Sequence, residues 1–450
     1  MSAKGIEETS VWEWKRGLFW LLFLGPFFFS TYGFANWISA QRGTTATFVF
    51  GWEQYIPFLP WTIIPYWSID LFYGLSLFTF HDRQRLDRHA FRLLTAQIIS
   101  ITCFILFPLR LAFIRPEIDE GVFNTLFMLL GNIDQHPYNQ APSLHISLLI
   151  ILWVRYAAIT KGKWQFFLHV WCALVGVSVL TTYQHQFIDV PTGMLVGFIC
   201  LWLWPDTGPP PLKRVGFSLS PRRRLLAFCY FAGACFLAVA AAGIGGAALW
   251  LWWGAVACFM VALAYGGLGV QAFQKVNGRL SLAASILMAP YLVAAWLNSR
   301  WWTRHKPLPN EVCDGVWLGR MPTTEELARS QFGALFDMTA ELAIHPGGKF
   351  YAAQPVLDLV PPTPDEFTNT ARKIENLRLH GAPVLVACAL GYSRSASAVA
   401  AWLLLTDRAK TVDEAVARLK KCRPQVILHS MHQQALANCV KIQIAENNHA

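Results

Sequence analysis

Long apolar stretches dominate the first two thirds of the chain, and short polar or basic segments separate them. An apolar run of about 17–25 residues is long enough to cross a bilayer as a helix. A Pro- and Gly-rich segment at 205–214 divides the apolar stretches into six before it and three after it. The pattern therefore predicts nine spans, near 17–38, 59–80, 93–113, 143–158, 164–182, 187–204, 225–244, 247–268 and 280–297.

The pattern changes after residue 304, where short runs with strand-like alternation are followed by helical stretches. The spacing of Thr and Glu at 363–366 and 411–414 is typical of a capping box at a helix start. Strands that alternate with helices indicate a compact α/β domain. The four predicted strands lie at 316–319, 334–339, 351–359 and 383–388.

The fold class predicted from these patterns is an α-helical polytopic membrane domain followed by an α/β domain. Only 14% of the residues are charged, against about 25% in soluble domains, which supports a membrane-embedded part. The predicted boundaries are a membrane domain at 1–205, a linker at 206–224, additional transmembrane helices at 225–300 and the α/β domain at 305–450.

The net charge of +10 belongs to the apolar part of the chain. Residues 1–304 hold 22 Lys and Arg against 13 Asp and Glu, whereas residues 305–450 hold 15 against 14. The basic loops all fall on one side of the membrane if the amino terminus is cytoplasmic. The positive charge therefore indicates how the chain is oriented in the membrane, and it does not indicate nucleic-acid binding. The 10 cysteines are scattered without a C-x-x-C pair, so neither a zinc site nor a disulfide scaffold is expected. No cofactor and no other metal site is expected.

A cysteine and an arginine flank the loop after the last predicted strand, in "VLVACALGYSRSA". Cys388 ends the strand, and Arg394 opens the next helix after five intervening residues. Such a loop gathers backbone N–H groups and a helix N-terminus around one point, which makes an anion site. A thiolate there can attack phosphorus, and Arg394 can hold two phosphate oxygens in its fork. Gly391 lets the loop bend without a side chain blocking the phosphate.

This segment resembles the signature of the dual-specificity branch of the protein tyrosine phosphatases, and the resemblance covers roughly residues 305–445. The resemblance implies that Cys388 is the nucleophile and Arg394 the phosphate binder. It further implies that Ser395 assists release of the thiol and that Asp358, thirty residues upstream, is the general acid. Ala387 stands where the family usually has His. The alternative interpretation is a buried apolar cysteine, with an aspartate that only closes a turn.

Two further motifs lie where loops meet predicted spans on the outer face, "PSLH" and "TYQHQFIDVPTG". They contribute His145 and His185. Asp189 follows His185 by four residues, so on a helix its carboxylate can orient the imidazole. Arg115 ends the third predicted span on that same face. Two histidines, a carboxylate and an arginine at one membrane surface suit phosphoryl transfer, although a single interfacial histidine often has no chemistry.

These motifs resemble the type-2 phosphatidic acid phosphatase superfamily, over roughly residues 50–205, and in particular the branch with "PSLH" that includes inositol-phosphoryl transferases to lipids. The resemblance implies a six-helix core. It implies that His185 forms a phosphohistidine, that Asp189 orients it and that His145 protonates the leaving group. Arg115 and Ser143 are implied to bind phosphate. The family often places Lys seven residues before its Arg-Pro, and Pro108 holds that position here. Arg110 is a further candidate for substrate binding, about 140° round a helix from Arg115.

The sequence thus predicts a bacterial membrane fusion protein, an integral phosphatase of the inner membrane with two phosphoryl-transfer sites. The histidine site would act on a phospholipid or lipid-linked phosphate from the extracytoplasmic side, and the cysteine site on phosphotyrosine, in a phosphoprotein partner, or on a lipid monophosphate. The alternatives are a lipid phosphotransferase and a catalytically dead scaffold. Nine spans place the carboxy-terminal domain outside, whereas the basic residues after residue 299 and a thiol that must stay reduced favour the inside.

Overall fold

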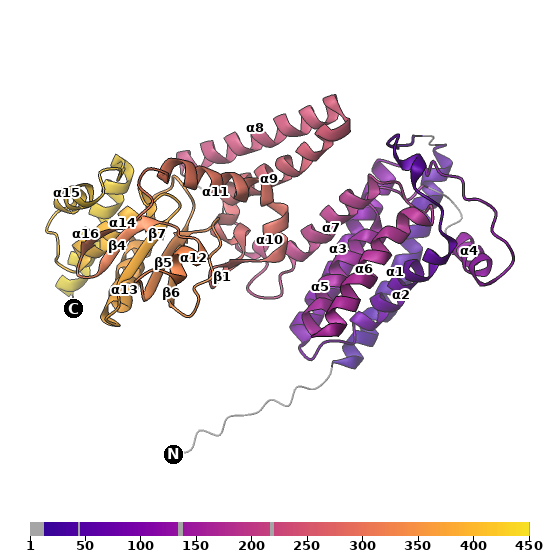
Figure 1. Ribbon diagram of the computed structural model, residues 1–450, viewed down its shortest axis with the longest axis horizontal. Helices are drawn as coiled ribbons and strands as arrows, with labels where there is room; N and C mark the ends of the chain where they lie inside the picture. The colour runs from indigo at the N-terminus through magenta and orange to yellow at the C-terminus, as the bar shows by residue number, and fades with distance from the viewer. Residues whose placement is uncertain (1–12, 44–45, 134–137, 217–219, 450) are drawn as a thin grey trace, which may run out of the picture. The chain divides into compact units, whose positions relative to one another are not determined.

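The computed structural model of the protein describes residues 13–43, 46–133, 138–216 and 220–449 (Figure 1). The chain divides into two compact units, Met1–Pro210 and Pro211–Ala450. The helical first part and the α/β end of the chain confirm the predicted fold class.

The first unit consists of helices and connecting loops, with no strand among its described residues. Asp82 begins α3 by accepting hydrogen bonds from the amides of Gln84 and Arg85. Ser143 caps α5 in the same way, through the amide of Ile146. The helices are α1 (Trp14–Gln41), α2 (Ile63–Ser76), α3 (Arg83–Leu106), α4 (Val122–Ile133), α5 (Leu144–Ile159), α6 (Lys163–Thr181) and α7 (Asp189–Leu203).

Small residues bring α5 and α7 into close contact. A Cβ at Gly193 would lie 2.5 Å from the carbonyl oxygen of Ser143, and one at Gly197 would lie 2.9 Å from that of Ser147. The Ser147 hydroxyl donates to the Gly193 carbonyl at 3.0 Å. This Gly-xxx-Gly spacing is typical of helices that pack backbone to backbone in membranes. It fixes the start of α5 next to the start of α7, where the predicted histidine motifs lie.

The third predicted span, 93–113, is wrong at its carboxyl end. The helix α3 ends at Leu106, and residues 107–119 are neither helix nor strand. Pro108 explains the stop, because proline disfavours helical geometry in the residue before it and lacks the N–H that a helix needs. Arg110 and Arg115 therefore lie on an extended loop, and the helical angle between them has no meaning.

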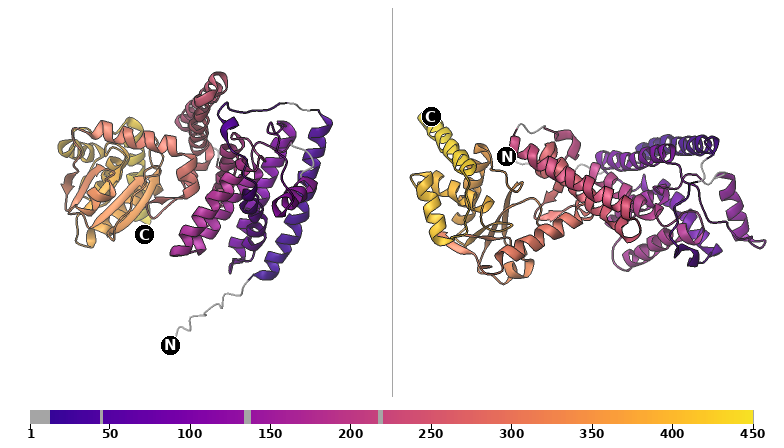
Figure 2. Two further views of the ribbon diagram at one scale, coloured as in Figure 1. Left: turned by 45° about the vertical axis from the view of Figure 1, so that its right-hand side comes forward. Right: turned by 90° about the horizontal axis from the view of Figure 1, so that it is seen from above.

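The second unit opens with membrane-type helices. The helix α8 (Pro221–Ile244) is followed by a continuous helical stretch that combines η4 (Gly246–Trp250), α9 (Leu251–Leu263), η5 (Ala264–Leu268) and η6 (Gly269–Phe273). A two-stranded hairpin, β1 (Lys275–Val276) and β2 (Arg279–Leu280), then leads to α10 (Leu282–Leu287) and α11 (Ala289–Thr303). Figure 2 shows α8 and α9 side by side as a helical hairpin.

A five-stranded sheet forms the rest of this unit, in the order β3-β4-β7-β5-β6. Strands β4, β7, β5 and β6 run parallel, and β3 pairs antiparallel with β4. Strand β7 therefore sits at the centre, where the strand order reverses, and a ligand site is expected at its carboxyl end. The strands are β3 (Asn310–Cys313), β4 (Val316–Arg320), β5 (Ala334–Thr339), β6 (Phe350–Val356) and β7 (Val384–Cys388).

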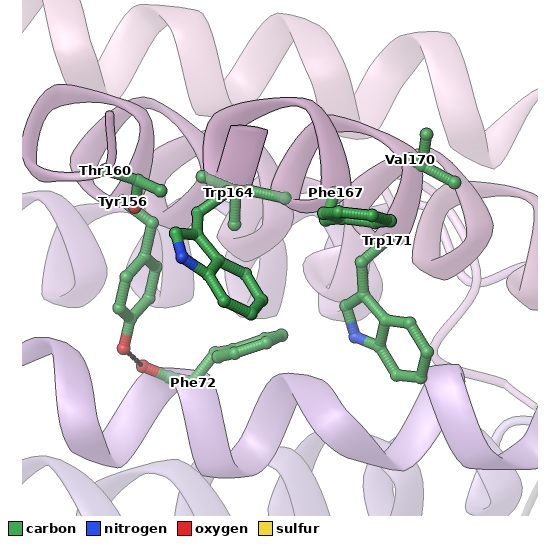
Figure 3. A pocket seen from close by; sticks show the side chains of 8 residues that line it. Phe72, Tyr156, Thr160, Trp164, Phe167, Val170 and Trp171 are labelled. Atoms are coloured by element: carbon green, nitrogen blue, oxygen red, sulfur yellow. Dashed lines mark hydrogen bonds between the residues drawn. The ribbon is translucent and has the colours of Figure 1, made fainter. Parts of the chain in front are cut away.

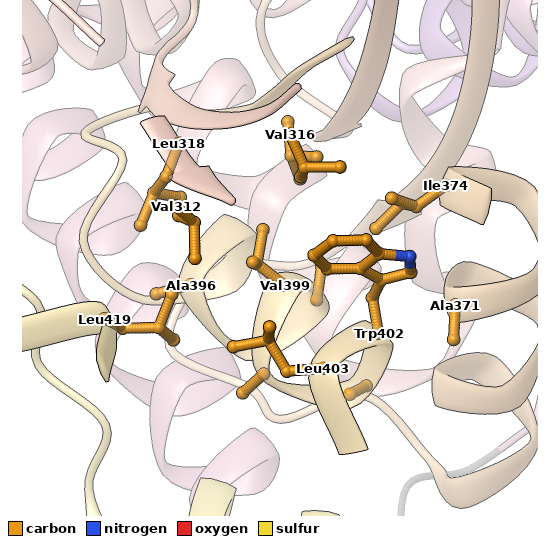
Figure 4. Close-up of a cluster of buried hydrophobic side chains, with 14 of the residues drawn as sticks. Val312, Val316, Leu318, Ala371, Ile374, Ala396, Val399, Trp402, Leu403 and Leu419 are labelled. Carbon is orange, nitrogen blue, oxygen red and sulfur yellow. The ribbon is translucent and has the colours of Figure 1, made fainter. Parts of the chain in front are cut away.

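Five helices accompany this sheet: α12 (Thr324–Ala328), α13 (Pro364–Leu379), α14 (Arg394–Leu405), α15 (Val412–Cys422) and α16 (Ser430–His449). Figure 4 shows the core on one face, where Trp402 and Val399 of α14 meet Ile374 of α13 and Val316 of β4. Thr363 and Glu366 form the predicted capping box of α13, and Thr411 caps α15 through the amide of Glu414. The helix α14, which starts at Arg394, is almost wholly buried.

Five helices among the described residues are long and apolar enough to cross a membrane: 14–41, 83–106, 163–181, 221–244 and 246–273. The protein is therefore a membrane protein, but nine spans are not confirmed. The ninth predicted span, 280–297, differs most. Its residues form a strand end, the short α10 and most of α11, and α11 has only 15 residues.

Candidate active sites

The loop from Cys388 to Arg394 closes around the cysteine sulfur at the carboxyl end of β7. The Gly391 amide donates to Cys388 Sγ at 3.2 Å, and the Ser395 hydroxyl donates to the same sulfur at 3.1 Å. The cysteine is buried, with 3% of its surface exposed. Two donors aimed at one sulfur are the arrangement that a nucleophilic thiolate requires.

Gly391 is required by two features of this loop. Its φ of +75° lies in the left-handed region, which side chains other than glycine rarely adopt. A Cβ built on it would lie 2.5 Å from the backbone carbon of Gly319, in the neighbouring strand β4. The loop thus packs directly on the backbone of β4, and no other residue fits at this position.

The guanidinium of Arg394 is held from one side by Glu341, which was not predicted from the sequence. The two Arg394 Nη atoms donate to the Glu341 carboxylate at 2.9 and 2.5 Å, and Nη1 also donates to the Val356 carbonyl at 3.0 Å. Both side chains are buried, with 2% and 5% exposed. A guanidinium carries five N–H groups, so Nε–H and one N–H of Nη2 remain for a phosphate.

Electrostatics keep this pair charged. Burial opposes the charge on Glu341, but the Arg394 guanidinium outweighs it and lowers the pKa of the carboxyl below its usual value. Burial likewise opposes the charge on Arg394, but the carboxylates of Glu341 and Asp358 hold its pKa well above the usual range. The site therefore contains a fixed positive charge beside the cysteine sulfur.

Strand β6 ends at Val356, whereas the predicted strand continued to residue 359. Asp358 therefore lies in the loop after β6 and not in the strand. Its Oδ1 lies 3.2 Å from Arg394 Nε, and its side chain is about half exposed. The next residue, Leu359, has a φ of +59° and is also exposed. The loop that carries Asp358 thus reaches Arg394, at the end of the loop that begins at Cys388.

A signal for Glu341 was present in the sequence. It follows strand β5 directly, and β5 pairs in parallel with β7, which ends at Cys388. An acidic residue at the carboxyl end of the strand beside β7 lies at the same sheet edge as Cys388. Strand order was needed to use this signal, and the sequence did not provide it.

Of the basic residues near the loop, the buried Arg423 contacts it, because its Nη2 donates to the Leu390 carbonyl at 3.4 Å. Lys349 and Arg320, in contrast, are engaged elsewhere. Lys349 donates to the carbonyls of Ser330 and Phe332 at 3.1 and 2.5 Å. Arg320 pairs with Glu326 at 2.6 Å. Neither side chain is directed to the phosphate-binding loop by these contacts.

The second candidate site lies at the starts of α5 and α7 in the first unit. His185 Nδ1 lies 3.1 Å from Asp189 Oδ2, the oxygen that also accepts the Gln186 amide at 2.9 Å. Both His185 and Asp189 are buried. The carboxylate therefore orients the imidazole through Nδ1, which leaves Nε2 as the nitrogen that can react.

His145 and Ser143 join this site from α5. The Ser143 amide donates to the Asp189 carbonyl at 3.1 Å, which ties the start of α5 to the start of α7. The His145 ring stacks on Tyr66 with centroids 4.2 Å apart, and it lies within electrostatic range of His185. Among the described residues, His145 Nε2 is buried without a hydrogen-bond partner.

The structure places Arg110 and Arg115 in the loop after α3. The Arg110 carbonyl accepts a hydrogen bond from the Gln186 side chain at 2.9 Å, so the backbone of this loop is tied next to His185. The Arg110 side chain itself is exposed. The Arg115 guanidinium lies 4.6 Å from the centroid of the Phe127 ring.

Glu53 is a further residue near this site that sequence reasoning missed. It is fully buried, and its carboxylate accepts from the amides of Phe187 and Phe50 at 2.7 and 2.8 Å. It thus fixes the loop between His185 and α7. It begins the three-residue 3-10 helix η1 (Glu53–Tyr55), which is too short to give a periodic signal from which to find it.

An apolar hollow of about 450 Å³ lies elsewhere, among α2, α5 and α6. Figure 3 shows its aromatic lining, with Phe72, Trp164 and Trp171. It contains none of the predicted site residues. Within the described part of the chain, no three His, Cys, Asp or Glu side chains come close enough to hold a metal ion.

Two family models match the chain. The PAP2 superfamily model matches residues 70–209, and the model of the dual-specificity phosphatase catalytic domain matches residues 316–440. The protein is therefore a phosphatase. Its chain joins a domain of the PAP2 superfamily to a dual-specificity phosphatase catalytic domain.

Solved structures similar to the chain align with about a third of it. Tk-PTP in its active form is 23% identical, with 30% of this chain and 98% of that chain covered and a TM-score of 0.28. Human DUSP28 is 20% identical, with 30% and 99% covered and a TM-score of 0.28. PTPMT1 in complex with PI(5)P is 19% identical, with 31% and 98% covered and a TM-score of 0.29. A search of curated proteins found no match to the chain.

Proposed function

We propose that the protein is an integral membrane phosphatase with two separate phosphoryl-transfer sites that use different nucleophiles. Cys388 is the nucleophile of one site and His185 of the other. The observation that carries the proposal is that each candidate nucleophile is held by its own polar partners. Cys388 Sγ accepts from Gly391 and Ser395 beside a buried Arg394, and His185 is oriented by Asp189.

At the cysteine site, a phosphate monoester binds to the loop amides and to the open edge of Arg394. Phosphate displaces Asp358 from that edge, and the carboxyl then faces the ester oxygen. Cys388 Sγ forms a bond to phosphorus while the ester P–O bond breaks, and Asp358 gives its proton to the departing oxygen. Water then attacks phosphorus, Asp358 takes up a proton, and the sulfur leaves with its bonding pair while Ser395 donates to it.

At the histidine site, His185 Nε2 forms a bond to phosphorus and the ester P–O bond breaks. His145 gives a proton to the departing oxygen, and the Asp189 carboxylate stabilises the positive charge that develops on His185. Water then attacks the phosphohistidine, His145 takes its proton, and the P–N bond breaks. Arg115 and Ser143 are proposed to hold the phosphate oxygens, with Arg110 as a further contact from the same loop.

The substrate of the histidine site is proposed to be a phospholipid or lipid-linked phosphate, because the site is built at the ends of apolar helices. The cysteine site is proposed to take a monophosphate, either phosphotyrosine or a lipid monoester. The loop from Cys388 to Arg394 contains no second basic residue, and Lys349 and Arg320 are engaged with other partners. A second phosphate would add about −1.5 to −2 charge with no partner in this loop.

The structure offers an argument about the side of the membrane on which each site lies. The helix α11 is joined to the phosphatase domain by its side-chain contacts. Its Ser299 hydroxyl donates to the Ala389 carbonyl of the phosphate-binding loop at 2.5 Å. We therefore assign α11 to the phosphatase domain and propose eight spans, six in the first unit and two in the second.

Eight spans return the chain to the side on which it began. The cysteine site then lies on the cytoplasmic side, where a thiol stays reduced. The histidine site lies on the extracytoplasmic side, because its loops follow α3 and α6 on the outside. For the bacterial inner membrane predicted from the sequence, this places the two sites on opposite faces. A reporter fused after residue 450 that is active only outside the cytoplasm would contradict this assignment.

The functional test separates the two sites by single substitutions in the full-length protein. Cys388→Ser is expected to abolish hydrolysis of a small aryl phosphate, and His185→Ala to abolish phosphate release from a lipid phosphate. The readout is inorganic phosphate, with the fold of each variant checked by circular dichroism. Undiminished activity in either folded variant would remove that site from the proposal, and undiminished activity in both would favour a scaffold.

A further inference from the structure

We propose that residues 222–303 are required for the activity of the cysteine site, although they precede the segment that matches the dual-specificity phosphatase model. They hold all three loops that carry its catalytic groups, and Tyr265 is the positioning residue of the general-acid loop. The inference rests on the proposed roles of Cys388 and Asp358. It goes beyond them because none of the holding residues lies in the segment that resembles a dual-specificity phosphatase.

The general-acid loop is held at two successive carbonyls. The Tyr265 hydroxyl donates to the Asp358 carbonyl at 2.9 Å, and Arg222 Nε donates to the Leu359 carbonyl at 2.8 Å. Leu359 adopts a φ of +59°, a conformation that needs outside support in a residue other than glycine. The two bonds supply that support, because they fix the peptide groups on both sides of the Leu359 Cα atom.

The loop that carries Glu341 is held by the β1–β2 hairpin. Lys275 Nζ donates to Asp337 Oδ2 and to the Leu342 carbonyl, both at 2.5 Å, and it is almost fully buried. The Ile344 amide donates to the Gly278 carbonyl at 2.8 Å. Lys275 therefore fixes the chain on both sides of Glu341, the residue that holds Arg394.

The phosphate-binding loop is held by α11. The Ser299 hydroxyl donates to the Ala389 carbonyl at 2.5 Å, one residue after the nucleophile. The Tyr392 hydroxyl donates to the Trp302 carbonyl at 3.3 Å. Neither contact uses a backbone amide of the loop, because one uses a carbonyl and the other a side chain.

Tyr265 is fixed by a stack of aromatic rings from the apolar helices. It is buried and lies parallel to Tyr230 of α8, with ring centroids 5.7 Å apart, and Tyr230 in turn meets the edge of Tyr291 of α11 at 5.9 Å. Tyr265 lies in η5, within the candidate span 246–273, and α8 is the other candidate span in this unit. The position of the general acid therefore depends on how these two membrane helices pack.

The test uses the full-length protein with His185→Ala, so that only the cysteine site releases phosphate. Tyr265→Phe removes the hydroxyl and keeps the ring. Nitrophenolate leaves without a proton, whereas an alkoxide needs one from the general acid. The hydrolysis of the phosphoenzyme is common to both substrates, so the comparison uses kcat/KM, which reports the steps up to departure of the leaving group. Tyr265→Phe is expected to lower kcat/KM for hexyl phosphate about 3- to 10-fold, as suits the loss of one hydrogen bond, and to leave kcat/KM for 4-nitrophenyl phosphate within about 2-fold.

Three comparisons make the result specific. Tyr156→Phe removes a tyrosine hydroxyl that donates to a backbone carbonyl in the first unit, that of Phe72 at 2.8 Å, and it should leave kcat/KM for both substrates unchanged. Asp358→Asn should show the same selective loss as Tyr265→Phe but a larger one. Both substitutions affect the same proton transfer, from Asp358 to the leaving group. The double variant should therefore be no slower than Asp358→Asn alone.

Equal losses for the two substrates in Tyr265→Phe, or no loss for either, would overturn the positioning role. Losses that add in the double variant would also overturn it. Failure of the proposed function has a different signature. In that case Cys388→Ser would keep its activity, or Asp358→Asn would show no dependence on the leaving group.

Discussion

Replacement of Glu341 by Gln should destabilise the cysteine site far more than an ordinary surface ion pair would. The pair with Arg394 is buried on both sides and joined by two hydrogen bonds of 2.9 and 2.5 Å. Removal of one partner from a buried pair costs about 3–5 kcal/mol. Gln keeps one acceptor oxygen but turns N–H groups towards the guanidinium, so we expect a loss of about 3 kcal/mol in the free energy of unfolding of the second unit.

The matched control is Glu326→Gln. Glu326 pairs with Arg320 at 2.6 Å, but its side chain is 45% exposed, so its ion pair should contribute less than about 1 kcal/mol. It also forms the capping box of α12 with Thr323, a role that Gln can fill. The two variants therefore make the same chemical change in a buried and in an exposed pair.

The assay is pulse proteolysis of the second unit in the full-length, detergent-solubilised protein over a series of urea concentrations, with kcat/KM for an aryl phosphate measured in parallel. In Glu341→Gln the carboxylate no longer holds the Arg394 guanidinium in place, so the affinity of the site for phosphate should also fall. The carboxyl pKa of Glu341 is lowered in the folded state, so its stabilisation is present at neutral pH and is lost as pH falls through that lowered value. The difference between wild type and variant should therefore shrink below about pH 4. If Glu341→Gln and Glu326→Gln lowered the free energy of unfolding by equal, small amounts, the reasoning would be refuted.

Three further predictions concern the two sites. In protein that already carries Cys388→Ser, His185→Ala should remove phosphate release from lipid phosphates, and equal activity of this variant and its parent would contradict the assignment. Asp189→Asn should slow phosphate release less, because Asp189 orients the nucleophile and does not itself attack. Gly391→Ala should abolish the cysteine activity, because its Cβ would lie 2.5 Å from the Gly319 backbone; a normal kcat would show that the loop can move. Compared at one ionic strength, kcat/KM of the cysteine site should be higher for a phosphotyrosine peptide or a lipid monophosphate than for an inositol trisphosphate lipid, and the reverse order would defeat the monophosphate assignment.

The α/β domain could be predicted from local patterns because its elements carry strong local signals. Strand β5 occupies the predicted 334–339, and β7 differs from its prediction by one residue. The capping box at Thr363 marks the start of α13 correctly. The nucleophile and the arginine share one loop, so their proximity follows from the sequence alone.

Residues that meet only through tertiary structure were not found. Glu341 reaches Arg394 because β5 and β7 are neighbours, and hydropathy does not encode strand order. Tyr265 looked like one more aromatic residue of an apolar helix, although its hydroxyl bonds to the acid loop. The end of the third span was misplaced because the apolar run continues past Pro108, where the helix has already stopped.

The most direct measurement of the central claim is the identity of the phosphorylated residue in each half-reaction. The full-length protein would be mixed with substrate, quenched within milliseconds and digested, and its phosphopeptides would be sequenced by mass spectrometry under conditions that preserve phosphohistidine. An aryl phosphate should label Cys388 and a lipid phosphate should label His185, and each label should vanish only in the variant that lacks that nucleophile. A single residue labelled by both substrates, or a label that survives loss of its assigned nucleophile, would contradict the existence of two independent sites.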